Sequence, residues 1–436
     1  ALTLPQHFRR HGYETVSAGK IYHGPFPDTE KSWSRKPKWV KWSHERPFRG
    51  YQKPENRELV KRLLKEMKEK GYGPPGLYGV SCGPPVEAAD VPDGAYPDGH
   101  IAEMAVATLR DLGDGPFFMG VGFHLPHLSL NAPKRYWDLY DPADIELASP
   151  GRPPENVPPM AWHESFELRT RYGVPKTGPI PEELQRRVIH GYLASASYVD
   201  AQVGRVLDEL DRQGRWDDTI VVLWADHGFH LGEQGMWAKA TNFETALRVP
   251  MIVYDPDMSE GDRSSDALVE LIDLYPTVTE LAGLPVPDEL EGTSVAPLLD
   301  NPSREWKSAA FSQFPCPALR EWAANPLPDA MHQEYFKPLM RKTKKRLKDF
   351  RGAEYEPELY LEHLMGYTMR TDRYRFTRWI DRRKPDAPPI AVELYDHEED
   401  PGETVNVAGD PDRRDVVRRL NRQMDAGWQG ARPDGA

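Results

Sequence analysis

The sequence predicts an α/β fold in which a mostly parallel sheet is flanked by helices, followed by a smaller α+β subdomain built on an antiparallel sheet. Three observations support this prediction. Apolar runs rich in β-branched residues stop at polar turn residues, as at 219–225. Segments with helical periodicity alternate with these runs, which is typical of helices that cover a parallel sheet. After about Leu299 the pattern changes to short alternating segments, so we expect a main domain over 1–299 and a subdomain over 300–436.

The elements of the main domain follow from hydrophobic periodicity and turn residues along the chain. Helical spacing and capping residues predict helices over 3–12, 55–70, 100–112, 185–213 and 268–282. Apolar runs bounded by turn residues predict strands over 13–18, 117–123, 219–225 and 250–254. Because helices and strands alternate, we expect the strands to pair in parallel and to be buried on both faces.

The subdomain is predicted from a different pattern. Residues 366–379 alternate like a hairpin, and 393–396 can add a third strand to it. A terminal helix is expected over about 413–428. The basic run over 337–351 is better explained as a solvated helix face than as an anion clamp, because most charge runs are solvated.

Length and composition exclude several classes of protein. The 436 residues are 39% hydrophobic and 28% charged, which indicates a globular chain. The net charge of −12 argues against a nucleic-acid partner, because a protein must neutralise phosphates to bind them. No stretch approaches the roughly 20 apolar residues that a membrane span needs. The two cysteines, Cys82 and Cys316, leave the redox compartment open.

The most informative segment is 219–239, TIVVLWADHGFHLGEQGMWAK. Its apolar run ends at Asp226, His227 and Gly228, and a polar loop then leads to Lys239. In open α/β sheets, reacting groups collect at the carboxyl ends of the strands. A carboxylate, an imidazole and an amine suit a sulfate or phosphate held on a hard divalent cation. An ordinary strand-to-loop turn gives the same short pattern, so the spacing alone leaves both interpretations open.

Two other predicted strands end in residues of the same kind. The first strand leads into Lys20 and His23, and the strand over 117–123 leads into His124 and His127. The carboxyl ends of parallel strands lie at one edge of a sheet. We therefore expect these side chains to gather with the carboxylate and the amine described above.

Four segments, GYETVSAGKIYH, PFFMGVGFHLPH, ADHGFHLGEQGMWAK and TNFETALRVP, together resemble the sulfatases of the alkaline phosphatase superfamily, in particular the iduronate-2-sulfatase-like branch. The resemblance covers most of the chain in the order of the family and includes LYDHEEDPGETVN near the end. It implies an alkaline-phosphatase-like fold and the hydrolysis of sulfate esters.

The resemblance also implies catalytic roles for individual residues. Lys20 and His23 match the lysine and histidine that hold and activate the nucleophile. His127 matches the histidine that protonates the leaving oxygen, and Lys239 matches the lysine that bridges the sulfate and the leaving oxygen. These residue types suit the reaction, because cations neutralise the charge that spreads over the sulfate oxygens in the transition state.

A metal site and a substrate pocket are implied in the same way. Asp226 matches a ligand of Ca²⁺, and His227 lies beside it at the metal or at the sulfate. We therefore expect one calcium ion as cofactor. His124 and His230 are expected to contribute to the substrate pocket, although a supporting role in a loop explains each of them as well.

The first half of the family's site does not occur in its usual place. Sulfatases carry paired aspartates for calcium and a Cys-x-Pro-Ser-Arg segment, whose Cys or Ser becomes the formylglycine nucleophile, upstream of the segment that contains Lys20. Only nineteen residues precede Lys20, so we expect an N-terminally truncated chain that is inactive alone. Cys316-Pro-Ala-Leu-Arg320 fits part of the pattern, but it lies in the C-terminal region and lacks the following Leu-x-Thr-Gly, so we do not expect Cys316 to be the nucleophile.

The expected function is hydrolysis of sulfate esters on a carbohydrate, with calcium as cofactor. Two alternatives stay open: a phosphodiesterase or phosphonate hydrolase of the same superfamily, and an inactive fragment that binds sulfated glycans. Bacterial relatives are commonly exported, so the resemblance implies a periplasmic or secreted protein. The sequence leaves the sugar, the sulfated position and the oligomeric state open.

Overall fold

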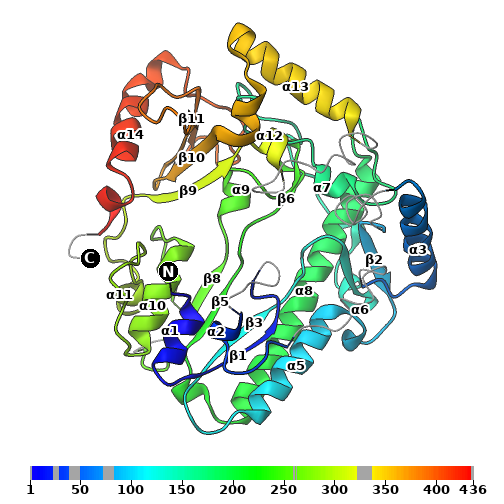
Figure 1. Cartoon of the computed structure of the whole chain (residues 1–436), viewed down its shortest axis with the longest axis vertical. Helices are drawn as coiled ribbons and strands as arrows, with labels where there is room; N and C mark the ends of the chain where they lie inside the picture. Colours follow the sequence, from blue (N-terminus) through cyan, green and yellow to red (C-terminus); the bar gives the residue numbers. More distant parts are fainter. Residues whose placement is uncertain are drawn as a thin grey trace.

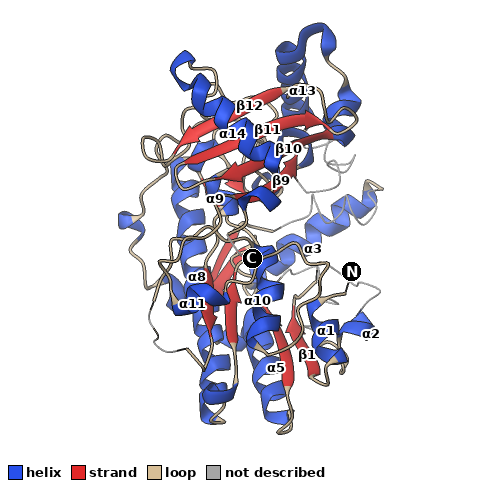
Figure 2. Cartoon of the chain, turned by 90° about the vertical axis from the view of Figure 1, so that its left-hand side faces the viewer, coloured by secondary structure: helices blue, strands red, loops and turns tan. Residues whose placement is uncertain are grey.

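The structure contains an α/β region and a C-terminal antiparallel sheet (Figure 1). It is a computed structural model that describes residues 2–22, 29–38, 50–71, 83–258, 261, 263–321 and 336–433. In Figure 2 the C-terminal sheet lies at the upper end of the molecule, above the strands and helices of the α/β region. Within the described residues, no helix is both long enough and apolar enough to cross a bilayer.

Two parallel strand pairs form part of the α/β region. They are β1 (Glu14–Gly19) with β3 (Phe117–Gly122), and β2 (Val86–Ala89) with β4 (Leu130–Pro133). Gly19 lies opposite Gly122, so β1 and β3 end side by side. A Cβ atom on Gly122 would meet the carbonyl oxygen of Lys20 at 1.8 Å. Glycine at this position therefore allows the backbones of the two strands to approach closely at the edge where we expected the reacting groups.

The third strand pair of the region is antiparallel. It joins β5 (Val221–Trp224) to β8 (Met251–Tyr254), so the prediction of a parallel strand over 250–254 was wrong. The connection contains the small hairpin of β6 (His230–Leu231) and β7 (Trp237–Ala238), and then the short helix α9 (Glu244–Leu247). The connection does not form the long crossover helix that usually joins parallel strands, and the chain returns to β5 in the opposite direction.

The strands β5 and β8 are also less buried than their apolar sequence predicted. Trp224 is 50% exposed and Ile252 is 60% exposed. Among the described residues, the hydrogen-bonded ladder of this pair joins neither of the parallel pairs. The expectation of a strand buried on both faces is therefore not met here, because the described chain does not cover both sides of it.

Helices pack around these strands. They are α1 (Leu4–Arg10), α2 (Thr29–Ser32), α3 (Pro54–Glu69), α5 (Pro97–Asp111), α6 (Lys134–Trp137), α7 (Phe166–Arg169), α8 (Glu182–Arg212), α10 (Leu274–Leu281) and α11 (Ala296–Asp300). The long helix α8 runs beside α5 (Figure 1). It buries Val188, Ala194 and Tyr198 in a core shared with β2 and β4. The predicted helices over 100–112 and 185–213 correspond to α5 and α8.

The C-terminal region is an antiparallel sheet with helices beside it. Its strands are β9 (Ala310–Pro315), β10 (Leu364–Arg370), β11 (Tyr374–Asp381) and β12 (Ala391–Asp396), in the order β12-β11-β10-β9. Its helices are α12 (Pro317–Arg320), α13 (Lys337–Arg351) and α14 (Arg414–Ala426). The structure confirms the hairpin, the third strand and the terminal helix, and it adds β9.

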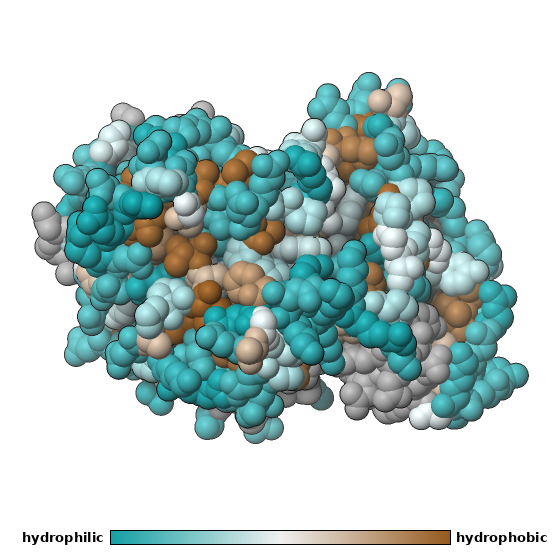
Figure 3. Space-filling model, turned by 90° about the horizontal axis from the view of Figure 1, so that it is seen from above, coloured by the Kyte–Doolittle hydropathy of each residue, from teal (hydrophilic) through white to brown (hydrophobic). Residues whose placement is uncertain are grey.

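The surface of this region is mostly polar. Seen from above, hydrophilic side chains cover most of the molecule, and apolar side chains gather in separate patches (Figure 3). In α13 the buried residues include Leu339, Met340 and Leu347, while most of its lysines and arginines are exposed. The structure thus confirms that the basic run is a solvated helix face.

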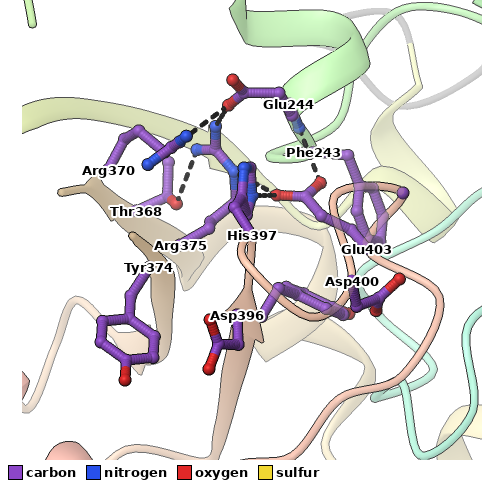
Figure 4. A network of polar contacts seen from close by, with 12 residues as sticks. Phe243, Glu244, Thr368, Arg370, Tyr374, Arg375, Asp396, His397, Asp400 and Glu403 are labelled. Carbon is purple, nitrogen blue, oxygen red and sulfur yellow. Dashed lines mark hydrogen bonds and ion pairs between the residues drawn. The ribbon is translucent and has the colours of Figure 1, made fainter. Parts of the chain in front are cut away.

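A buried ion-pair network joins the C-terminal sheet to the α/β region (Figure 4). Arg375 on β11 donates from Nε to Glu403 Oε1 at 2.6 Å, and it also pairs with Glu244 on α9. His397 Nε2 lies 2.9 Å from the same Oε1 atom, and the backbone N–H of Glu244 donates to Glu403 Oε2 at 2.7 Å. The side chains of Arg375 and Glu403 are 3% and 1% exposed, so the network is shielded from water.

Arg375→Met should lower the free energy of unfolding by about 3–5 kcal/mol, because it leaves the buried Glu403 carboxylate without its main cation. Urea unfolding of the two proteins measures the difference. Arg152→Met is the matched control, since Arg152 and its partner Glu155 are 67% and 59% exposed. The control should cost less than about 1 kcal/mol. Equal losses in the two variants would show that the network contributes no more than a surface pair.

Cys316 lies just after β9 in a second apolar core. Its neighbours in this core include Met160, Phe166 and Phe336, so the core joins the C-terminal region to the α/β region. The residue is fully buried and carries a free thiol, while Cys82 lies outside the described residues. Burial raises the pKa of the Cys316 thiol to about 12. Since the thiolate is the nucleophilic form, this position is unsuited to covalent catalysis.

The thiol of Cys316 should resist alkylation in the folded protein. We expect iodoacetamide near neutral pH to leave the peptide that contains Cys316 unmodified, because the reagent meets neither a thiolate nor an open path. The same treatment in denaturant should label it fully. Peptide mass spectrometry separates this site from Cys82. Rapid labelling of Cys316 under native conditions would reopen its assignment as a nucleophile.

Candidate active site

The loop after β3 carries the first pair of candidate residues. Its first residues are held by Asp98, a fully buried side chain in α5 that accepts the backbone N–H groups of His124 and Leu125 at 2.9 Å each. The His124 ring is 45% exposed, and its Nδ1 lies 3.6 Å from Asp98 Oδ1. This carboxylate fixes the start of the loop, and His127 follows three residues after His124.

The His127 ring is oriented by backbone and by a carboxylate. Its Nδ1 donates to the Leu128 carbonyl oxygen at 2.7 Å, which leaves Nε2 as the reactive nitrogen. Nε2 lies 3.4 Å from Glu167 Oε1, and Arg171 donates to the same Leu128 carbonyl at 3.1 Å. The ring is 40% exposed, so it can be reached from solvent.

Glu167 on α7 connects His127 to Lys239. Its Oε2 lies 3.5 Å from Lys239 Nζ, so one carboxylate contacts both candidate residues. The Glu167 side chain is 6% exposed, whereas the Lys239 side chain is 21% exposed. The structure therefore brings together two of the predicted residues, from loops more than a hundred positions apart in the sequence, over a carboxylate that was not predicted.

The charges in this group shift one another's protonation. Burial alone would raise the pKa of Glu167, but the charges of Lys239, His127 and Arg171 outweigh it and lower the pKa. For His127, burial against the surrounding protein lowers the pKa first and Lys239 lowers it further, while Glu167 offsets part of the shift. Glu167 is therefore ionised near neutral pH, and His127 gives up a proton readily.

The loop that carries Lys239 has an unusual backbone. Ala238 and Ala240 have φ values of 96° and 74°, in the left-handed region that side chains with a Cβ disfavour. The carbonyl oxygen of Lys239 accepts a hydrogen bond from His163 Nε2 at 2.8 Å. His163 Nδ1 accepts the backbone N–H of Ser165 at 3.0 Å, so both ring nitrogens are used by a neutral imidazole. Burial lowers the pKa of His163 to about 4, which keeps it neutral.

His230 supports the same loop from inside the protein. The residue is fully buried, and its Nε2 lies 2.9 Å from Thr241 Oγ1. Burial lowers the pKa of His230 to about 3. Of the two roles considered for this histidine, the geometry favours support of the loop over direct contact with a substrate.

Asp226 and His227 follow β5 as predicted and remain available to a ligand. The Asp226 side chain is 73% exposed, and its Oδ1 lies 3.6 Å from His227 Nε2. His227 Nδ1 donates to the Gly228 carbonyl at 2.8 Å, which leaves the Nε2 lone pair free, as in a metal-bound imidazole. Burial first, and then Lys239, lower the pKa of His227, so this nitrogen is unprotonated near neutral pH.

These two residues alone offer too few donors to hold a calcium ion. Ca²⁺ usually takes about six to eight oxygen ligands, and one carboxylate with one imidazole supplies two donors. In the described ranges, groups of three side chains that could hold a metal occur elsewhere, at Glu244 with His397 and Glu403, and at Glu358 with Glu362 and His363. The first of these groups is already neutralised by Arg375, and the second is mostly exposed. The donor types of Asp226 and His227 fit a divalent cation, and its remaining ligands would have to come from other groups.

Two further predicted residues belong to the first strand. The backbone N–H of Lys20 donates to the Gly122 carbonyl at 2.8 Å. The backbone of Lys20 therefore lies at the same ends of β1 and β3 as the start of the loop that carries His124. His23 lies outside the described residues. Sequence reasoning missed Glu167, His163 and Glu321, because no apolar run or short motif marks them.

Comparisons with known proteins identify the family of the chain. Residues 2–284 match the family model described as Sulfatase, and residues 315–429 match the one described as N-sulphoglucosamine sulphohydrolase, C-terminal. Iduronate 2-sulfatase of Mus musculus is 30% identical, and that of Homo sapiens 31% identical, over 96% of this chain and 78% of each relative.

Solved structures share the alkaline-phosphatase-like fold. A phosphonate monoester hydrolase from Silicibacter pomeroyi has a TM-score of 0.67 at 22% identity and covers 98% of this chain and 80% of its own. An enzyme in complex with its substrate D-glucosamine-2-N,6-O-disulfate has a TM-score of 0.62 at 18% identity and covers 98% and 82%. Together with the family match over 2–284 and the alignment of iduronate 2-sulfatases with almost the whole chain, these findings show that the chain belongs to the sulfatase family.

Proposed function

We propose that this chain carries the greater part of a calcium-dependent sulfatase that hydrolyses sulfate esters of a sulfated carbohydrate. The observation that carries the proposal is the group of His127, Glu167 and Lys239, which places an imidazole and an amine side by side at a spot that solvent can reach, in a member of the sulfatase family. The carbohydrate class is supported by the iduronate 2-sulfatases and by the solved complex with a disulfated glucosamine. By the same kinship, we propose a periplasmic or secreted location.

The proposed chemistry divides between two cations. Lys239 Nζ holds a sulfate oxygen and the bridging oxygen, and it stabilises the charge that develops there. His127 donates a proton from Nε2 to the leaving sugar oxygen. A bound sulfate ester brings negative charge to the ring, which raises the pKa of His127 and helps it to hold that proton until the bond breaks.

The remaining parts of the site are proposed from the same family resemblance. Sulfatases generally use a divalent metal, and Asp226 and His227 would be two of the ligands of a Ca²⁺ ion. The ion would supply positive charge to the sulfate oxygens. Lys20 and His23 would hold and activate a formylglycine nucleophile. The Cys-x-Pro-Ser-Arg segment that produces formylglycine does not occur in these 436 residues, so activity tests require an enzyme that carries it. His124 would contribute a partly exposed ring to the substrate pocket.

A phosphonate or phosphodiester hydrolase is the second candidate. It is favoured by the likeness in fold to a phosphonate monoester hydrolase, and by the similar size and charge of the two oxyanions. A third candidate is a protein that binds sulfated glycans without cleaving them. It would bind the anion with the same imidazole and amine, without a nucleophile.

Turnover of paired esters distinguishes these candidates. We expect the enzyme with its nucleophile segment to cleave a sulfate monoester of a sugar at least ten times faster, in kcat/KM, than the matching phosphate or phosphonate ester, about 1.4 kcal/mol in transition-state free energy. Release of inorganic sulfate and phosphate measures both rates. Faster cleavage of the phosphorus ester would favour the second candidate, and tight binding without release of either ion would favour the third.

The role of His127 predicts a dependence on the leaving group. His127→Ala should reduce kcat about 10²–10⁴-fold for sugar sulfates, whose alkoxide needs a proton, and much less for nitrophenyl sulfate, whose leaving group needs none. Steady-state kinetics with both substrates measures the contrast. An equal loss for both would remove the assignment of His127 as general acid.

A further inference from the structure

We propose that Glu167 is a positioning residue that holds His127 and Lys239 together at the place where an anionic ester binds. This inference rests on the proposed function only for the identity of the ester. No motif marks this residue, and the family resemblance assigned it no role. The proposal comes from its place beneath two residues that do have proposed roles.

The geometry places the carboxylate behind the imidazole and the amine. Each oxygen of Glu167 contacts one partner, His127 Nε2 at 3.4 Å and Lys239 Nζ at 3.5 Å. The exposed fractions of the side chains increase from 6% for Glu167 to 21% for Lys239 and 40% for His127. An anion that arrives from solvent therefore meets the imidazole and the amine first, while the carboxylate stays on their inner side.

The backbone of Glu167 is itself held in place. It lies in the first turn of α7, where the carboxylate of Glu321 accepts the N–H of Phe166 at 2.7 Å and the N–H of Glu167 at 2.9 Å. The carbonyl oxygen of Glu167 accepts Thr170 Oγ1 at 2.7 Å. The backbone N–H and the carbonyl oxygen of Glu167 are thus both hydrogen-bonded. Because its backbone is fixed, the carboxylate can hold His127 and Lys239 in position.

The balance of charge explains why this position needs an acid. Lys239 and Arg171 act on Glu167 together with His127, and Lys239 and Glu167 also act on His227. Without a carboxylate, the charges of Lys239 and Arg171 would lose the negative charge that balances them, and Lys239 would move toward water. The ionised Glu167 is not suited to be the proton donor itself, so its contribution is to orient and balance the groups that react.

Three variants test the proposal. Glu167→Gln keeps the shape but removes the charge, and Glu167→Asp keeps the charge but shortens the side chain. Glu164→Gln is the matched control, since Glu164 lies in the same segment but pairs with Arg346 at 3.0 Å. The first readout is the NMR titration of the His127 ring, assigned by the signal that disappears in His127→Gln, and it needs no catalytic activity.

We expect the titration midpoint of His127 to fall by about one pH unit or more in Glu167→Gln, a tenfold change in proton affinity, because the nearby negative charge is lost. Glu167→Asp should move it less in the same direction, and Glu164→Gln should not move it. A folded Glu167→Gln protein that titrates like the wild type would overturn the proposal. If Glu167→Gln does not fold, the same comparison is made with Glu167→Asp, whose unchanged midpoint would overturn it equally.

Kinetics in the enzyme with its nucleophile segment gives the second readout. Glu167→Gln should lower kcat at least tenfold with a smaller change in KM, and should move the basic limb of the pH profile to lower pH. Glu167→Asp should restore part of kcat. A wild type that cleaves phosphorus esters in preference to sulfate esters would refute the proposed function but leave the titration result intact. An unaltered kcat and pH profile in Glu167→Gln would refute the positioning role alone.

Discussion

The structure of the site depends on one constraint: cations that must attract an anion would also repel one another. Lys239 and Arg171 bring two positive charges to the region of the His127 ring, and the buried carboxylate of Glu167 balances them. Its charge keeps Lys239 in place while the ring and the amine still face solvent. A site of this kind can bind an oxyanion without a further free-energy cost for bringing its own charges together.

The C-terminal region is part of this constraint, although its sheet carries none of the residues with proposed catalytic roles. Glu321 holds the start of α7 from a position 154 residues further along the chain, and its oxygen also lies 3.3 Å from His163. Burial raises the pKa of Glu321 to about 8, so this carboxyl can be protonated beside the unprotonated Nδ1 of His163. The apolar core around Cys316 and the Arg375 network bring this region close enough for such contacts.

The sequence predicted the residues that follow strands, but not those held by contacts between distant segments. Asp226, His127 and Lys20 could be predicted because each follows a strand, and strand ends are set by local apolar runs. Glu167, His163 and Glu321 could not, because α7 has only four residues and its partners are remote in sequence. The antiparallel pairing of β8 was also beyond local patterns, since it depends on how the loop with Lys239 turns back.

In the loop that carries Lys239, the backbone conformation differs from the one that its residues prefer. Ala238 and Ala240 take a backbone conformation that alanine disfavours, at a cost of order 1–3 kcal/mol each. The surrounding contacts determine the loop at several points: His163 bonds the Lys239 carbonyl, His230 bonds Thr241, and Glu403 accepts the N–H of Glu244. Such strain persists only where packing outweighs it, and here it turns the Lys239 side chain toward Glu167. His230, whose role the sequence left open, and His163, which it missed, therefore both support the loop that holds this lysine.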